Sequence, residues 1–210
     1  MIDLPRQIHC YISSEGLSGE SAHKNLIPGN RPSAKHIQQD GNIKAKRSAV
    51  LILLYPKAGE WHNVLIKRPV YPGTHSGQIS FPGGKVEKQD PTTSATALRE
   101  ANEEIGVEIQ DITIIDELTD IYIPPSNFLV HPYLACIDYT PDFIPDNHEV
   151  ASIIEYEVMK LTDPNLLKKK DITFANGFTM NTPYFDIHEH TVWGATGIML
   201  SELKEILKSL

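Results

Sequence analysis

Three glutamates at helical spacing are the residues of this chain whose types and positions point most directly to chemistry. Glu100, Glu103 and Glu104 stand at positions i, i+3 and i+4, and a rotation of about 100° per residue places them in one sector of a helix. Like charges at i and i+4 repel each other, so this arrangement favours a bound cation. Clustered carboxylate oxygens suit Mg²⁺ or Mn²⁺ better than zinc. The spacing therefore predicts a divalent-metal site.

A double glycine precedes these glutamates. Gly83 and Gly84 allow the backbone to approach a ligand closely, and the Gly83 carbonyl is a candidate metal ligand. A metal beside such a loop neutralises phosphate oxygens and activates a water molecule, so the predicted chemistry is metal-assisted attack on a phosphate. The alternative is an ordinary solvated acidic face of a helix.

Local sequence patterns predict the elements that position these residues. A helix over 92–105 presents the glutamates on one face and apolar residues on the other, with Asp90 or Thr92 as its cap and Gly106 at its end. We further expect strands at 48–55, 61–67, 78–81, 112–123, 129–138, 150–158, 172–174, 178–180 and 183–187, a short helix with a basic end at 161–170, and a terminal helix over 194–210.

The composition is that of one folded unit. The chain has 210 residues, of which 40% are hydrophobic and 22% charged, enough for one sizeable core. Strands mixed with two good helices around a single core predict an α/β sandwich. We divide the chain into an N-terminal arm, 1–46, and a main domain, 47–210, because the first segment is polar and is broken by a loop at 28–32.

Charge and cysteine content narrow the class of protein. The net charge of −8 argues against broad binding to nucleic-acid backbones or to anionic membranes. No apolar run approaches ~18 residues, so we expect no membrane span. Cys10 and Cys136 show neither metal spacing nor a CxxC motif, which predicts reduced thiols in a cytoplasmic protein.

The glycines and the carboxylate helix together resemble the box of the Nudix hydrolase family. That box reads G-x5-E-x7-R-E-U-x-E-E-x-G-U, where U is a bulky aliphatic residue. The chain matches it at Gly84, Arg99, Glu100, Glu103, Glu104, Gly106 and Val107. It departs from the box in the middle, because Asp90 stands in place of the first Glu and eight residues rather than seven separate Asp90 from Arg99. Ala101 is also small for its position.

The resemblance implies an α/β/α sandwich with a mixed β-sheet, and hydrolysis of a nucleoside diphosphate that is linked to another group. It implies that Mg²⁺ or Mn²⁺ is bound by Glu100, Glu103, Glu104 and the Gly83 carbonyl. It also implies that Arg99 orients a box carboxylate rather than touching the substrate.

Two acidic residues keep more than one interpretation. Asp90 is either a helix cap or a further metal ligand. The general base is either a box glutamate, such as Glu103 or Glu104, or a residue from a distant loop. Glu149 stands in such a loop before an expected strand, although an ordinary surface carboxylate is an equal alternative there.

A second motif resembles the segment L-L-T-x-R-[SA]-x3-R-x3-G-x3-F-P-G-G of Nudix coenzyme A pyrophosphatases. The chain matches this segment at Leu65, Arg68, Gly77 and 81–84, and departs from it at Ile66, Pro69 and Gly73. The resemblance implies cleavage of coenzyme A or acyl-coenzyme A to 3′,5′-ADP and 4′-phosphopantetheine or its acyl form. The candidate substrate contacts are Lys67, Arg68, His75, Gly77, Phe81 and Ser126.

Several alternatives stay open at this point. Gly73 cannot make the bidentate phosphate contact of an arginine, so ADP-ribose, NADH or a dinucleoside polyphosphate are alternative substrates. A non-catalytic, ligand-binding Nudix domain is a second alternative, although such domains typically lose box carboxylates. Ser126 follows two prolines, so turn chemistry explains it as well as substrate binding does. The oligomeric state is open, with a homodimer as one arrangement.

Overall fold

The computed structural model describes residues 3–24, 26, 33–39, 44–72, 75–173, 177 and 179–210. The expected loop at 28–32 and the departure at Gly73 lie outside these residues.

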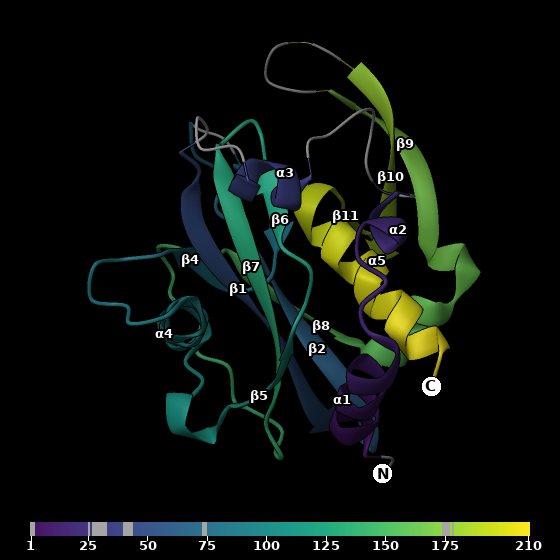
Figure 1. The fold of residues 1–210 in the computed structure, drawn as a ribbon. Coiled ribbons are helices and arrows are strands. Elements are labelled where there is room, and N and C mark those ends of the chain that lie inside the picture. Colours follow the sequence, from purple (N-terminus) through teal and green to yellow (C-terminus); the bar gives the residue numbers. More distant parts are fainter. Residues whose placement is uncertain are drawn as a thin grey trace.

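A mixed eight-stranded sheet forms the centre of the molecule (Figure 1). Its strands are β1 Lys46–Lys57, β2 Glu60–Lys67, β3 Ile79–Ser80, β4 Gly83–Lys85, β5 Thr113–Glu117, β6 Ile121–Ile123, β7 Phe128–Cys136 and β8 Ser152–Glu157. The strand order is β3-β2-β1-β7-β5, while β4 pairs with β1, β6 with β7, and β8 with β2. The strands β1 and β7 run parallel, whereas β1 is antiparallel to β2 and β4.

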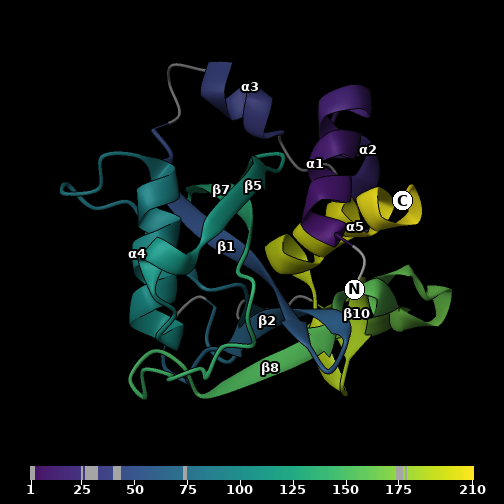
Figure 2. The same ribbon diagram turned by 90° about the horizontal axis from the view of Figure 1, so that it is seen from below.

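Helices cover both faces of this sheet (Figures 1 and 2). Helix α4, Thr93–Ile105, lies on one face, whereas α1, Leu4–Glu15, and α5, Gly194–Lys208, lie on the other. Successive side chains of a strand point to opposite faces, so Leu51 of β1 packs in the core under α4 and Ile52 in the core under α5. The expected sandwich with a mixed sheet is therefore confirmed.

The remaining elements are short. They are helices α2 Glu20–His23 and α3 Ala34–Gln39, the 3-10 turns Ile109–Asp111, Val158–Thr162 and Pro164–Leu166, and a three-stranded sheet of β9 Leu167–Thr173, β10 Thr179–Ile187 and β11 His190–Val192. Phe185 and Ile187 of this small sheet share the core that contains α5. None of the described helices is long and apolar enough to cross a membrane.

The helix predicted at 161–170 is wrong. The first of two 3-10 turns ends at Thr162 and the second at Leu166, and the chain then extends as β9. Lys168 forms a 2.6 Å ion pair with Asp186 of β10, and the ammonium of Lys170 lies 5.3 Å from the centre of the Tyr184 ring. These cross-strand partners stabilise an extended chain, and none of them is visible to a reading of local periodicity.

Three smaller differences from the sequence prediction follow from pairing and length. The expected strand 112–123 is two strands, because residues 118–120 leave the ladder between β5 and β6. Gly83–Lys85 forms a strand on β1 within a segment predicted as loop. Helix α5 ends at Lys208 rather than at the predicted residue 210, and Leu210 beyond it is 45% exposed.

The N-terminal segment is tied to the rest of the fold by one buried carboxylate. Glu202 of α5 has no exposed surface. It accepts hydrogen bonds from the Gly19 N–H at 3.0 Å and from the Thr119 hydroxyl at 2.6 Å, and its second oxygen lies 3.3 Å from the His23 Nε2. A buried charge of this kind needs such partners, so α2, α5 and the segment after β5 are held together.

Candidate active site

Helix α4 begins and ends where its local sequence requires. The Thr92 hydroxyl accepts a 3.1 Å hydrogen bond from the Ala95 N–H, which makes Thr92 rather than Asp90 the N-cap. Gly106 adopts φ 72° in the left-handed region, and its N–H donates to the Asn102 carbonyl at 3.0 Å. The predicted helix bounds are confirmed, and the box glutamates lie in the middle and last turns of α4.

The double glycine lets β4 and α4 approach each other. At Gly83 a Cβ would lie 2.4 Å from the Ala49 carbonyl oxygen of the neighbouring strand. At Gly84 a Cβ would lie 2.4 Å from the Glu100 carboxylate. The Gly83 N–H donates to Glu104 Oε2 at 2.8 Å. Gly83 is therefore required by the close approach of β4 to β1, and Gly84 by the contact of β4 with the Glu100 carboxylate.

Three carboxylates converge beside this loop. One oxygen each of Glu100, Glu104 and Glu149 lies within 4.8 Å of the others. Glu104 is 1% exposed, and its Oε1 has no hydrogen-bond partner. Burial raises the pKa of Glu104 to about 8 and raises that of Glu100. An unpartnered buried oxygen in an all-oxygen set fits a hard divalent cation, which would remove much of this electrostatic cost.

Backbone hydrogen bonds bring Glu149 to the box. The Ile144 N–H donates to the Ile105 carbonyl and the Asp146 N–H to the Glu104 carbonyl, both at 3.0 Å. The Asp146 carbonyl in turn accepts from the Glu149 N–H at 3.1 Å. The loop before β8 is thereby fastened to the end of α4. Glu149 is exposed, yet it belongs to the carboxylate group, which the sequence alone left undecided.

Arg99 lies between the first glutamates and Asp90. Its Nη2 is 2.9 Å from Glu100 Oε1, and its Nη1 donates to Glu103 Oε2 at 2.8 Å. Glu103 is 57% exposed at its side chain and is outside the three-carboxylate group. One guanidinium nevertheless holds the carboxylates of Glu100 and Glu103 side by side. This geometry agrees with an orienting role for Arg99.

The role of Asp90 is one that sequence reasoning left ambiguous. Its carboxylate accepts from the Arg99 Nε, from the Thr96 hydroxyl at 2.9 Å and from the Glu87 N–H at 2.9 Å. The hydrogen bonds from Arg99 hold the pKa of Asp90 well below its usual range. Asp90 therefore contacts Arg99 and is not part of the carboxylate group.

Arg68 is the cation closest to the buried glutamate among the ion pairs of the described residues. Its Nη2 donates to the Gly83 carbonyl at 3.1 Å and lies 3.9 Å from Glu104 Oε1. The Gly83 carbonyl, a predicted metal ligand, thus already accepts one hydrogen bond. Arg68 retains further N–H donors, so it is well placed to meet an anion beside the carboxylates.

The other candidate substrate residues of this region lie on the connection from β2 to β3. Lys67 ends β2, and the backbone N–H of Arg68 donates to the Gln78 carbonyl at 2.9 Å. His75 and Gly77 adopt φ 72° and 65° in the turns of this loop, and His75 Nδ1 lies 2.9 Å from Gln78 Oε1. These residues therefore lie at the end of β2 or in the loop after it, in the same stretch of chain as Arg68.

Two candidate substrate residues are placed differently. Phe81 has no exposed surface and packs in the core that contains α5, so its substrate contact stays a prediction. Ser126 lies in the turn before β7, where its Oγ is buried without a hydrogen-bond partner. Asn127 has φ 55°, and its Nδ2 donates to the Lys44 carbonyl at 3.1 Å. The turn is thus held through Asn127, and the substrate contact of Ser126 stays a prediction.

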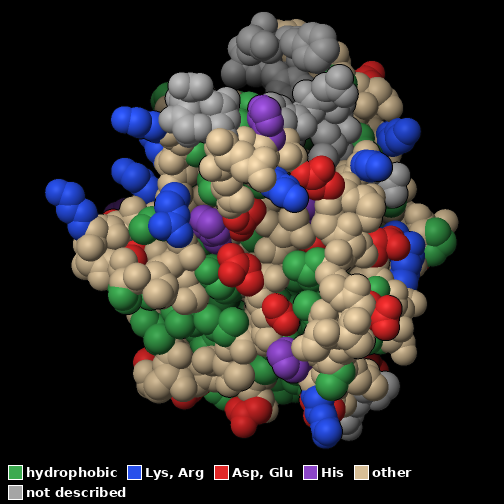
Figure 3. All heavy atoms as spheres, in the orientation of Figure 1, with side chains coloured by type: hydrophobic (Ala, Val, Ile, Leu, Met, Phe, Trp, Pro, Cys, Tyr) green, Lys and Arg blue, Asp and Glu red, His purple; other side chains and the backbone are tan. Residues whose placement is uncertain are grey.

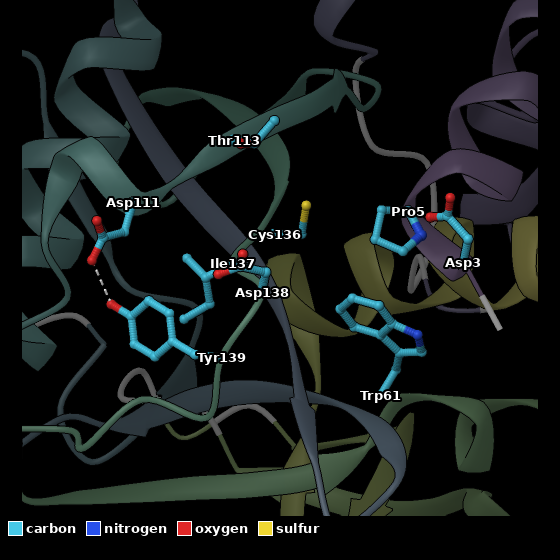
Figure 4. Close-up of a pocket in the computed structure, with 9 residues that line it drawn as sticks. All are labelled: Asp3, Pro5, Trp61, Asp111, Thr113, Cys136, Ile137, Asp138 and Tyr139. Atoms are coloured by element: carbon cyan, nitrogen blue, oxygen red, sulfur yellow. Dashed lines mark hydrogen bonds between the residues drawn. The ribbon is translucent and has the colours of Figure 1, made fainter. Parts of the chain in front are cut away.

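A separate pocket of about 530 Å³ holds none of these residues. The nine residues that line it are labelled in Figure 4, and they include Asp3 beside α1, Trp61 of β2 and Tyr139 after β7. The Tyr139 hydroxyl donates to Asp111 Oδ2 at 2.8 Å. The candidate active site is therefore defined by the carboxylate group and not by this hollow.

A comparison with models of protein families identifies the family to which the chain belongs. The model of the NUDIX domain matches residues 45–179, more than half of the chain. The chain belongs to the Nudix hydrolase family. The resemblance found in the sequence is thus confirmed at the level of the family.

Two relatives of this Nudix chain extend well beyond the part that they share with it. The chain is 32% identical over 169 residues to Nudix hydrolase 15, mitochondrial, of Arabidopsis thaliana. This match covers 75% of this chain and 58% of that protein. It is 26% identical over 132 residues to a peroxisomal coenzyme A diphosphatase of Mus musculus. This second match covers 63% of this chain and 56% of that protein. The chain thus spans less than two thirds of the length of these two relatives.

A solved structure supports the fold. A Nudix hydrolase from M. smegmatis has a TM-score of 0.55 at 14% identity, over 79% of this chain and 88% of that chain. At this identity the likeness concerns the fold alone.

Proposed function

We propose that this Nudix chain is a metal-dependent pyrophosphohydrolase that cleaves coenzyme A or acyl-coenzyme A to 3′,5′-ADP and 4′-phosphopantetheine or its acyl form. The hydrolase activity is supported by the group of Glu100, Glu104 and Glu149 beside Arg68. The substrate rests on the coenzyme A motif that ends at 81–84 and on the similarity to the mouse coenzyme A diphosphatase.

The residues of the carboxylate group would hold the cofactor. When bound, Mg²⁺ or Mn²⁺ neutralises phosphate oxygens and lowers the pKa of a coordinated water. Glu100, Glu104 and Glu149 offer the carboxylate oxygens that these ions prefer. Glu103 is proposed as a further ligand, because Arg99 holds its carboxylate beside that of Glu100.

The reaction adds water across one P–O bond of the pyrophosphate. The water oxygen bonds to phosphorus, the bridging oxygen leaves with the other phosphoryl group, and the water loses a proton. Glu149 or a box glutamate accepts that proton. Arg68 donates to a phosphate oxygen, and Arg99 keeps Glu100 in position for the ion. Much of the work in such reactions is positioning and charge stabilisation.

Product analysis tests this proposal. The protein is incubated with coenzyme A, ADP-ribose and NADH in parallel, each with Mg²⁺ or Mn²⁺ and each with a chelator. We expect 3′,5′-ADP to form from coenzyme A faster than any product from the other two, and only with metal. Faster metal-dependent turnover of ADP-ribose or NADH would contradict the substrate and keep the hydrolase. No turnover of any pyrophosphate would contradict the hydrolase itself and favour a ligand-binding domain.

A small-molecule partner agrees with the charge of the molecule. The net charge is −8, and on the face drawn in Figure 3 acidic side chains lie across the middle while basic ones lie mostly toward the margins. Such a surface does not favour a nucleic-acid backbone. The relatives named above include a mitochondrial and a peroxisomal protein, so the cytoplasmic location stays a prediction, as does a homodimer.

A further inference from the structure

A second group of metal-ligating side chains lies on the strands beyond β1. Glu117 ends β5, Asp120 lies between β5 and β6, and His131 belongs to β7. One oxygen or nitrogen of each lies within 4.8 Å of the others. These strands neighbour one another in Figure 1, and β5 and β6 both pair with β7. The hairpin-like arrangement therefore brings three separate positions of the sequence together.

This group is distinct from the box carboxylates. Ala49 of β1 pairs with Gly84 on one side and with His131 on the other, and α4 packs over β1 through Ala97. Glu100 lies against Gly84, so β1 lies between the strand beside Glu100 and the strand that carries His131. No residue is shared by the two groups.

The buried imidazole of His131 places one of its nitrogens against two carboxylates. Its side chain is 10% exposed, and its Nε2 has no hydrogen-bond partner. Its Nδ1 faces the cluster, 2.8 Å from Asp120 Oδ1 and 3.5 Å from Glu117 Oε1. The buried Asp120 Oδ1 makes no hydrogen bond of regular geometry, and its 2.8 Å contact with His131 Nδ1 is at ion-pair distance.

Those two distances match the spacing of atoms that share an ion. Ligands about 2.1 Å from one ion lie about 3.0 Å apart in adjacent octahedral positions and about 3.4 Å apart in a tetrahedron. The distances from His131 Nδ1 to Asp120 and to Glu117, 2.8 and 3.5 Å, bracket these values.

The charge of the group also calls for a cation. Within the described part of the chain, no lysine or arginine forms an ion pair with Glu117 or Asp120. The second oxygen of Asp120 accepts a 2.6 Å hydrogen bond from Gln38 Nε2 of α3, which orients Oδ1 toward His131. Asp120 is the more buried of the two carboxylates, at 20% exposure of its side chain, and such a charge beside an imidazole is costly unless a proton or a metal ion neutralises it.

We propose that Glu117, Asp120 and His131 bind a divalent transition-metal ion of the Zn²⁺ class. An imidazole nitrogen with two carboxylates is a zinc-type donor set, whereas the all-oxygen box suits Mg²⁺ or Mn²⁺. Water completes the coordination. The ion joins the connection between β5 and β6 to β7, and through Gln38 it is linked to α3. This proposal does not depend on the substrate or the activity proposed above.

Zinc titration in the presence of excess Mg²⁺ tests the site, because Mg²⁺ competes with Zn²⁺ for an all-oxygen group more effectively than for a group that contains an imidazole. The full chain is freed of metal with a chelator, and Zn²⁺ binding is followed by calorimetry and by metal analysis after dialysis. We expect one Zn²⁺ per chain in the unchanged protein and in Glu100→Gln/Glu104→Gln. We expect at least about a tenfold loss of affinity in His131→Gln and in Glu117→Gln.

The two variants keep the test decisive. Glu117 is 47% exposed at its side chain, so Glu117→Gln serves even where the buried His131→Gln variant fails to fold. Co²⁺ added in place of Zn²⁺ provides a spectroscopic readout, because its visible bands depend on the imidazole ligand. No Zn²⁺ retained by the unchanged protein would overturn the proposal in favour of a protonated His131. Zn²⁺ lost in the box variant and kept in Glu117→Gln would overturn it as well.

Discussion

Asp90 and Arg99 form a two-pronged ion pair, with Arg99 Nε 3.0 Å from Asp90 Oδ1 and Arg99 Nη2 3.0 Å from Asp90 Oδ2. The Asp90 side chain is almost fully buried in this contact. Bidentate pairs of this kind fix the plane of the guanidinium. Arg99 is thereby held in the orientation in which its remaining N–H groups reach Glu100 and Glu103.

Removing the charge of Asp90 should weaken both the fold and turnover. Asp90→Asn leaves a buried guanidinium with a poorer partner, so we expect a loss of about 2–4 kcal/mol in the free energy of unfolding and a lower kcat. Because Arg99 depresses the pKa of Asp90, the stabilisation is present above the ordinary carboxyl pKa and is lost as the pH falls through the depressed value. Denaturant unfolding at several pH values measures this, with the exposed Glu60→Gln as control. Equal unfolding energies for the two variants would contradict the expectation.

The exposed box glutamate offers a test of metal ligation without loss of stability. Glu103→Gln should lower kcat by about 10²-fold or more, because the position would lose a charged ligand. The side chain is 57% exposed, so the melting temperature should change little. Steady-state kinetics at a range of Mn²⁺ concentrations checks this. Near-normal turnover would remove Glu103 from the mechanism.

Glu104 should lower the stability of the metal-free protein at high pH, although activity requires it. Burial raises the pKa of Glu104 to about 8, so the folded state binds its proton more tightly than the unfolded state. Stability of the chelated protein should therefore fall as the pH rises from about 4.5 through about 8. Glu104→Gln should abolish that fall, raise the melting temperature near pH 8 by roughly 3–6 °C, and remove activity. A pH dependence that is unchanged in the variant would contradict this account.

The loop carboxylate distinguishes a base from a ligand. As general base, Glu149 would be needed at any metal concentration, and Glu149→Gln would lower kcat by about 10²–10⁴-fold. If Glu149 is a metal ligand only, a higher Mn²⁺ concentration would restore the activity of the variant. We expect the first result. The neighbouring exposed His148→Gln is the matched control for disturbance of the loop.

The glycine under Glu100 should be intolerant of a methyl group. A Cβ at Gly84 would lie 2.4 Å from the Glu100 carboxylate, which would have to move. We expect Gly84→Ala to lower kcat/KM by about 100-fold with a small change in melting temperature, because Glu100 is the flexible partner. The substitution should cost little further activity in a Glu100→Gln background, and independent losses in the double variant would argue against this contact.

The local features of the site were predictable because they depend on residues one or two turns apart. The caps at Thr92 and Gly106 and the spacing of the glutamates determine the bounds of α4 and its carboxylate face. The strands β1 and β2 were equally readable from their apolar runs and from the turn between them. The resemblance to the Nudix box added the family and the kind of reaction.

Only the tertiary structure decided which carboxylates meet. Glu149 reaches Glu104 because backbone hydrogen bonds fasten a loop some forty residues later to the end of α4, and no local pattern encodes that distance. The same holds for the basic run that starts at Lys168, which is a strand because Asp186 and Tyr184 lie across from it. It also holds for His131, which meets Asp120 through the pairing of β6 with β7. By itself the sequence determined the chemical groups and the local elements that carry them. Long-range pairing and burial decided their neighbours, because these depend on contacts between distant segments of the chain.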